Sequence, residues 1–211
     1  GSMYLVCNNN LLYHGCIPMT KDGEFAEYDV SGVRVLGKAL LDRAEQIARI
    51  GYFGKSHSPE KRYGQDFLWY LWCGAGSPVY GKNKMTSFER YFIDDKDTWT
   101  EIKDPYYEHI NSVSTCKKIL TEFGVNPDGF SHIINGHVPV IIKKGEKPIR
   151  AGGKLLVIDG GLSRAYQEKT GIAGYTLLFN SHGLLLSVRE AFESVKNAIM
   201  EDADIHSTLE T

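Results

Sequence analysis

Short strand-like segments stand at both ends of this sequence, and helical segments fill the region between them. Apolar patterning predicts strands at residues 4–7 and 11–13 near the start. A second group of strands is predicted at residues 130–134, 138–142, 154–158, 174–180 and 182–188. Because strands and helices do not alternate, a doubly wound parallel sheet is disfavoured. The order favours a layered α/β sandwich with a helical insertion.

The helical segments are recognised by their spacing and end signals. Apolar residues recur at helical spacing over residues 32–52, which predicts an amphipathic helix. Ser58 and Pro59 predict the start of a second helix, whose residues 67–72 are apolar on all sides and are therefore expected to be buried. Further helices are predicted at residues 105–123 and 189–200.

Composition limits the class of protein. The 211 residues are 42% hydrophobic and 24% charged, which is typical of a globular domain. We expect residues 3–211 to form a single region, mostly helical at 31–125 and rich in strands at 126–190. Gly1 and Ser2, before Met3, look like the scar of a removed expression tag.

Charge and cysteine content exclude some partners and compartments. The net charge of −2 gives no basic field for nucleic acid, and no apolar run approaches the ~18 residues that span a bilayer. The four cysteines show no regular spacing, and no secretory signal precedes them. We therefore expect free thiols in a reducing compartment, the cytoplasm.

Two histidine loops are the strongest candidates for chemistry. His14 and Gly15 directly follow the strand at residues 11–13, and Gly136 and His137 directly follow an apolar strand. A strand fixes the backbone and the glycine lets it turn sharply, so an imidazole nitrogen can be presented to a metal. One such histidine alone is more often a half-buried structural residue, but two in one chain make metal ligation an equal alternative.

A local positive cluster is the second candidate. Lys82, Lys84 and Arg90 lie in a loop rich in aromatic residues, in a chain whose net charge is negative. Such a cluster suits the capture of a small phosphate or phosphate ester. The alternative is an ordinary solvated loop, in which Arg90 packs on Phe88 or Tyr91 and pairs with a nearby carboxylate.

Five segments together resemble the C-terminal part of class 3 fructose-1,6-bisphosphatase, a bacterial enzyme family with the calcineurin-like metallophosphoesterase fold. The segments contain both histidine loops, an aromatic helix end, the surroundings of Arg90 and a strand followed by two glycines. They are residues 10–18, 68–74, 87–92, 135–140 and 158–163. The resemblance covers nearly the whole chain and implies the C-terminal half of a layered α/β/β/α sandwich with a helical insertion.

The resemblance also implies roles for single residues. His14 stands at the His-Gly position and His137 at the Gly-His position of the superfamily, so both are implied as metal ligands. Arg90, with Lys82 and Lys84, is implied to hold a substrate phosphate. The Asp-x-His, Gly-Asp-x-x-x-Arg-Gly and Gly-Asn-His motifs of the superfamily are absent from this sequence. We expect these motifs in a missing N-terminal half. We also expect that this chain alone does not retain the two metal ions and is inactive.

The implied activity is hydrolysis of fructose 1,6-bisphosphate to fructose 6-phosphate and phosphate in gluconeogenesis. Two Mn²⁺ or Mg²⁺ ions, which suit mixed oxygen and nitrogen ligands, would activate a hydroxide. The expected partners are the sugar bisphosphate and the N-terminal half of the same protein, with a homo-oligomer left open. Two alternatives remain: a metallophosphatase for another phosphomonoester, and a non-catalytic regulatory domain that binds a phosphorylated metabolite. The preceding sequence would discriminate between them.

Overall fold

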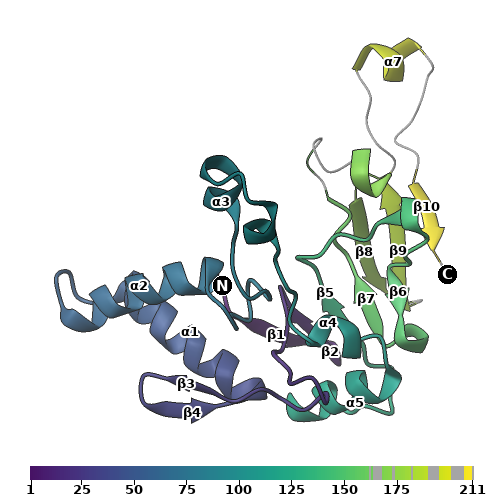
Figure 1. Cartoon of the computed structure of the whole chain (residues 1–211). Coiled ribbons are helices and arrows are strands. Elements are labelled where there is room, and N and C mark those ends of the chain that lie inside the picture. The colour runs from purple at the N-terminus through teal and green to yellow at the C-terminus, as the bar shows by residue number, and fades with distance from the viewer. Residues whose placement is uncertain are drawn as a thin grey trace. The chain divides into compact units, whose positions relative to one another are not determined.

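The structure is a computed structural model, and it describes residues 1–161, 163, 168–172, 174–181, 183–189, 195–200 and 207–210. The chain divides into two compact units, Gly1–Ile133 and Ile134–Thr211. Strands and helices occur in both units, so the predicted mixed α/β class is confirmed (Figure 1). Among the described helices, none is long and apolar enough to cross a bilayer.

The first unit opens with the predicted hairpin. β1 (Tyr4–Cys7) pairs antiparallel with β2 (Asn10–Tyr13), and Tyr4 lies opposite Tyr13. Asn8 and Asn9 join the strands with positive φ angles of 49° and 60°. Asparagine tolerates this left-handed conformation, and two such residues in sequence match the twist of a hairpin. The backbone N–H of Leu11 also donates to the carbonyl of His132, at 2.9 Å.

A second hairpin occupies the start of the segment that was predicted to be helical. β3 (Tyr28–Val30) pairs with β4 (Val33–Val35) around Ser31 and Gly32, whose φ angles are 58° and 74°. The prediction that the helix spans residues 32–52 is therefore wrong at its start. Val35 of β4 fitted a helical spacing, but the Ser-Gly turn and the strand pairing decide the local structure.

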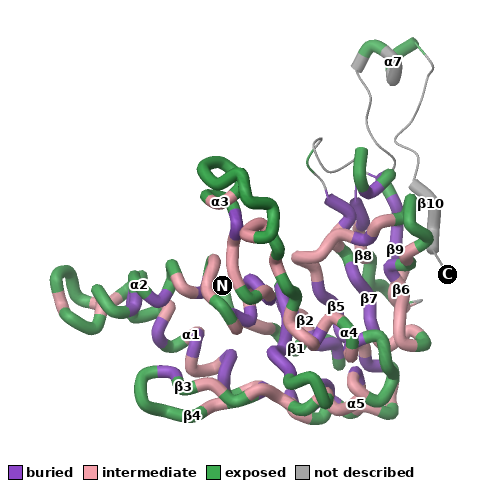
Figure 2. The backbone as a smooth tube through the Cα atoms, viewed as in Figure 1, coloured by how far each residue is buried: buried purple, intermediate pink, exposed green. Residues whose placement is uncertain are grey.

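Two long helices form an antiparallel hairpin. α1 (Gly37–Phe53) buries Leu40, Leu41, Ala44 and Ile47. α2 (Pro59–Cys73) begins as predicted, because the Ser58 hydroxyl accepts the backbone N–H of Lys61 at 3.1 Å and Pro59 is the first helical residue. The expectation that residues 67–72 are buried on all sides is wrong. Phe67 and Leu71 are buried, but Leu68, Trp69 and Trp72 are exposed. Figure 2 shows both buried and exposed stretches along α2.

Short helices complete the first unit. α3 (Ser87–Phe92) and the 3-10 helix η1 (Lys96–Trp99) form a projecting excursion. The predicted helix at residues 105–123 is broken into α4 (Tyr106–His109) and α5 (Val113–Glu122). The break occurs because Ser112 adopts an extended backbone, with φ −89° and ψ 135°. Cys116, Ile119 and Leu120 of α5 are buried.

In the second unit, β7 (Leu155–Val157) lies between β5 (Ile133–Asn135) and β6 (Ile149–Arg150). A separate sheet has β9 (Gly183–Arg189) between β8 (Gly174–Asn180) and β10 (Ser207–Glu210). The remaining elements are η2 (Ile142–Lys144), η3 (Ala151–Gly153) and α7 (Val195–Met200).

Two segments of the second unit differ from the elements predicted for them. The strand predicted at 138–142 is wrong: these residues form a loop in which Val140 is buried, and η2 starts at Ile142. Of the helix predicted at 189–200, Arg189 belongs to β9, residues 190–194 lie outside the described residues, and α7 is helical.

Candidate functional site

His14 is presented by a strand end that is fixed from two sides. The preceding Tyr13 is buried, and its hydroxyl lies 2.6 Å from the hydroxyl of Tyr106 in α4. After His14, the backbone of Gly15 packs directly on Pro78 and Val79: a Cβ at Gly15 would lie 2.6 Å from the Val79 carbonyl oxygen and closer still to that of Pro78. The side chain of His14 itself is exposed. The loop is therefore rigid while the imidazole is accessible.

Cys16, the residue after Gly15, belongs to the buried core of the first unit. Cys16 is buried, and its backbone N–H donates to the Pro78 carbonyl at 2.8 Å. Burial raises the pKa of the Cys16 thiol, and the carboxyl of Asp104 raises it further. Since the thiolate is the reactive and metal-binding form, Cys16 has a structural role at neutral pH. The four cysteines, Cys7, Cys16, Cys73 and Cys116, are free, as predicted.

His137 stands in a strained turn of the second unit. It follows β5 and Gly136, and its φ angle is 66°, in the left-handed region. The backbone N–H of Val138 donates to the Gly136 carbonyl at 2.8 Å, which closes the turn around His137. A non-glycine residue in this region costs about 1–3 kcal/mol, and such strain clusters at functional sites.

Asp159 lies beside the His137 loop, and the sequence analysis gave it no role. It follows β7, and its carbonyl accepts the backbone N–H of Val140 at 2.8 Å. Its carboxylate accepts the N–H of Gly161 at 2.9 Å, and its Cβ would be 3.7 Å from a Cβ at Gly136. The signal in the sequence was a carboxylate directly after a buried strand and before two glycines.

The two predicted histidine ligands belong to different units, His14 to the first and His137 to the second. Over the part of the chain that the structure describes, no three His, Cys, Asp or Glu side chains are grouped to hold one ion. The described side chains therefore do not form a complete metal site. The donors that are available, imidazole nitrogen and carboxylate oxygen, are the kinds that Mn²⁺ accepts.

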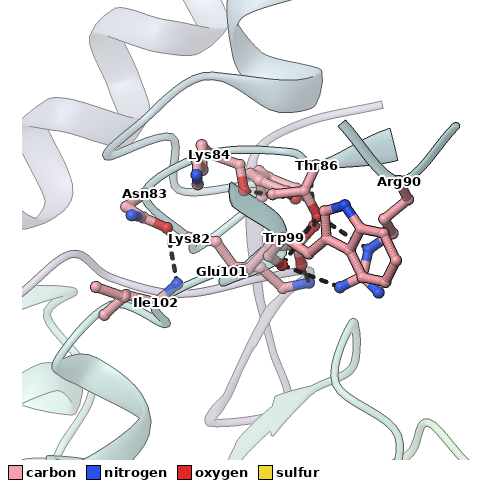
Figure 3. Close-up of polar contacts among 9 residues, drawn as sticks. Lys82, Asn83, Lys84, Thr86, Arg90, Trp99, Glu101 and Ile102 are labelled. Atoms are coloured by element: carbon pink, nitrogen blue, oxygen red, sulfur yellow. Dashed lines mark hydrogen bonds and ion pairs between the residues drawn. The ribbon is translucent and has the colours of Figure 1, made fainter. Parts of the chain in front are cut away.

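The three predicted phosphate-binding residues lie in or beside the α3 excursion: Lys82 and Lys84 precede α3, and Arg90 lies within this helix rather than in a loop (Figure 3). Lys82 pairs with Glu101 at 2.6 Å, and the Lys84 ammonium donates to the Thr98 carbonyl at 2.8 Å. Arg90 donates from Nε to the Thr86 hydroxyl at 3.0 Å and from a terminal nitrogen to the Trp99 carbonyl at 3.1 Å. Each cation therefore has partners within the chain.

Trp99 and Glu101 organise this network. The guanidinium of Arg90 lies 5.8 Å from the centre of a Trp99 ring, and the Trp99 indole N–H donates to the carbonyls of Glu89 and Ile93. The Glu101 carboxylate accepts both the N–H and the hydroxyl of buried Thr86, each at 3.0 Å. The ring under the Arg90 guanidinium is thus that of Trp99. A phosphate role for the three cations stays a prediction.

The whole chain, residues 1–211, matches the family model described as Firmicute fructose-1,6-bisphosphatase. The chain belongs to this family. A class 3 fructose-1,6-bisphosphatase of Clostridium novyi (strain NT) is 57% identical over 208 residues, which cover 99% of this chain and 31% of that protein. Its counterpart from Alkaliphilus metalliredigens (strain QYMF) is 58% identical over 210 residues, with the same coverage of 99% and 31%. No solved structure matches the chain.

This member of the Firmicute fructose-1,6-bisphosphatase family therefore spans about a third of the length of the curated relatives that it matches. The recognition made from the sequence is confirmed by the family match.

The Glu101 network makes stability depend on acid pH. Burial alone would raise the pKa of Glu101, but the Lys82 ion pair and the hydrogen bonds from Thr86 outweigh it and lower that pKa to about 2. A carboxyl with a depressed pKa stabilises the fold above its unfolded value of 4.5, and this contribution is lost as the pH falls towards 2. Glu101→Gln should therefore lower the free energy of unfolding by roughly 1–2 kcal/mol at pH 7, and by much less near pH 2.

Urea unfolding at a series of pH values measures this difference. Glu24→Gln is the matched control, because Glu24 also pairs with a lysine, Lys118, but its side chain is 73% exposed against 20% for Glu101. The control should change stability little at any pH. Equal effects of the two substitutions at pH 7 would contradict the role given to Glu101.

Proposed function

We propose that this chain works as part of a longer protein that hydrolyses fructose 1,6-bisphosphate to fructose 6-phosphate and phosphate. The observation that carries the proposal is the match of all 211 residues to a fructose-1,6-bisphosphatase family, together with relatives that bear this name. The reaction would serve gluconeogenesis. The four free cysteines suit a cytoplasmic location.

The proposal extends to the fold and the metal ions. We propose the calcineurin-like metallophosphoesterase fold for the complete protein, with Mn²⁺ or Mg²⁺ as the cofactor. Such ions would supply a nucleophile at neutral pH and Lewis-acid stabilisation of the phosphoryl group. His14 and His137 would each hold an ion through a neutral imidazole nitrogen, and the other ligands would come from the part of the protein outside this chain.

This chain's own residues then have distinct tasks. The contact of Gly15 with Pro78 and Val79 fixes the direction of His14. Asp159 holds the His137 loop through its bonds to Val140 and Gly161. Arg90 remains exposed despite its bonds, so it can exchange the Trp99 carbonyl for a substrate phosphate. Lys82 and Lys84 would add positive potential beside it.

Phosphate release from fructose 1,6-bisphosphate tests this function. A full-length protein that contains this chain should turn over in the presence of Mn²⁺, and the 211-residue chain alone should not, because two imidazoles cannot hold two divalent ions. A full-length protein that binds the sugar bisphosphate without hydrolysing it would favour the regulatory alternative. Metal-dependent turnover by the isolated chain would contradict the proposal that the other metal ligands lie outside this chain.

A further inference from the structure

The α1–α2 hairpin carries an apolar surface that the proposed function does not use. The two helices approach at the level of their backbones, since a Cβ at Gly51 would lie 2.6 Å from the carbonyl oxygen of Gly64. Phe67 and Leu71 of α2 are buried. With so little room between the helices, the larger side chains that flank them are left outside.

These outer side chains form one surface, here named the hairpin face: Tyr52, Phe53, Leu68, Trp69 and Trp72. Their exposed fractions are 73%, 72%, 39%, 61% and 55%. The rings contact one another in pairs: Tyr52 and Phe53 meet edge to face with centroids 4.7 Å apart, and Trp69 and Trp72 do so at 5.0 Å. Figure 2 shows exposed residues along α2. Contiguous exposed aromatic residues of this kind mark binding surfaces, and Trp and Tyr dominate interface energies.

The hairpin face borders a groove of about 680 Å³, lined by Tyr52, Phe53, Leu68 and Trp72 together with the first residues of the chain. Those first residues are bonded to α1 at the groove's edge. The backbone N–H of Met3 donates to the Glu45 carboxylate at 2.9 Å, and Arg49 donates to the carbonyl of Gly1 at 2.8 Å. The groove thus has an apolar floor and a polar rim at which Met3 is held. Gly1 and Ser2, which we expect to be a tag scar, occupy the place that the preceding residues of a longer polypeptide would take.

We propose that the groove and the hairpin face bind a segment of the same polypeptide, from the two thirds of the relatives' length that this chain does not cover. The chain accounts for 31% of those relatives, so about two thirds of their length remains to supply a docking segment. A segment joined near Met3 is tethered at the groove and has a high effective concentration there. A second copy of the chain has no such tether. The bound segment is expected to be apolar and able to seat against indole rings.

This proposal shares with the proposed function only the premise that the chain works within a longer protein, and its test does not measure activity. The chain has three tryptophans, and Trp99→Phe leaves Trp69 and Trp72 as the only ones. Acrylamide should quench them strongly in the 211-residue chain. In the full-length protein, with any tryptophan outside this chain also replaced by phenylalanine, the quenching constant should be at least about threefold lower, because a docked segment excludes the quencher. Unchanged quenching in the full-length protein would overturn the proposal.

A second measurement does not depend on the Trp99 variant. Trp72→Ser in the full-length protein should lower the melting temperature and raise the rate of proteolysis of the docked segment, whereas in the 211-residue chain it should leave the melting temperature nearly unchanged. Phe130→Ser is the matched control, because Phe130 is an aromatic residue of the same unit, 95% exposed and outside the hairpin face. Sedimentation of the 211-residue chain completes the test. A dimer that Trp72→Ser dissociates, with no separate effect in the full-length protein, would assign the face to a second copy instead.

Discussion

Replacing His137 by alanine in the full-length protein is expected to lower kcat/KM for fructose 1,6-bisphosphate by about a thousandfold or more, since loss of a residue that only supports a ligand already costs about 10–100-fold. His14→Ala should have an effect of the same order. The physical reason is that each imidazole is implied to hold one ion of a pair, and the remaining donors cannot keep that ion in place. Bound metal, measured on the purified variants, should fall in parallel.

The backbone of His137 calls for a specific control, because its φ angle of 66° makes any substitution there sensitive to strain. His57 is exposed and has a φ angle of 64°, so His57→Ala removes an imidazole from the same backbone conformation without touching the candidate site. It should leave kcat/KM unchanged. His137→Asn keeps a residue that tolerates this conformation and should still be inactive. Activity near the wild-type level in His137→Asn would contradict the ligand role.

Gly15→Ala is expected to destabilise the first unit by about 2–3 kcal/mol, the upper part of the range for overpacking. The added Cβ would meet the carbonyl oxygens of Pro78 and Val79, which are backbone atoms and cannot swing away as a side chain does. To relieve the clash, the end of β2 must move away from Pro78, and His14 moves with it. The full-length variant should therefore also bind metal more weakly.

Urea unfolding of the 211-residue chain measures the stability change. Gly129→Ala is the matched control, because its Cβ would have its nearest neighbour at 3.6 Å, an ordinary contact, and the backbone is not left-handed. It should change the midpoint little. If the two variants unfold at the same urea concentration, the close approach of Gly15 to Pro78 is not what holds the His14 loop.

Local signals in the sequence were enough to predict some elements. The run of asparagines at residues 8–10 marked the turn between β1 and β2, and Ser58 with Pro59 marked the start of α2. Both features depend on a few adjacent residues and their own backbone, so they can be predicted from the sequence alone. The fold class followed from the order of such elements.

Other features depended on neighbours distant in the sequence. The apolar spacing at the start of the predicted helix could not reveal that β3 would pair with β4. The apolar run at residues 67–72 could not reveal which of its side chains would be buried. The candidate site divides in the same way. Both histidine loops follow strands as predicted, but the place of Asp159 beside Gly136 depends on how β5 and β7 lie together.

Hydrogen bonds join the two ends of the α3 excursion at its base. Asn83 and Ile102 exchange two hydrogen bonds, of 2.9 and 2.7 Å, and the N–H of Asp104 donates to the Gly81 carbonyl at 3.0 Å. Because the ends are already joined, changing the number of residues between them costs only a little loop entropy. Evolution can therefore lengthen, shorten or exchange this excursion between family members while the strand ends that carry the histidines stay in place.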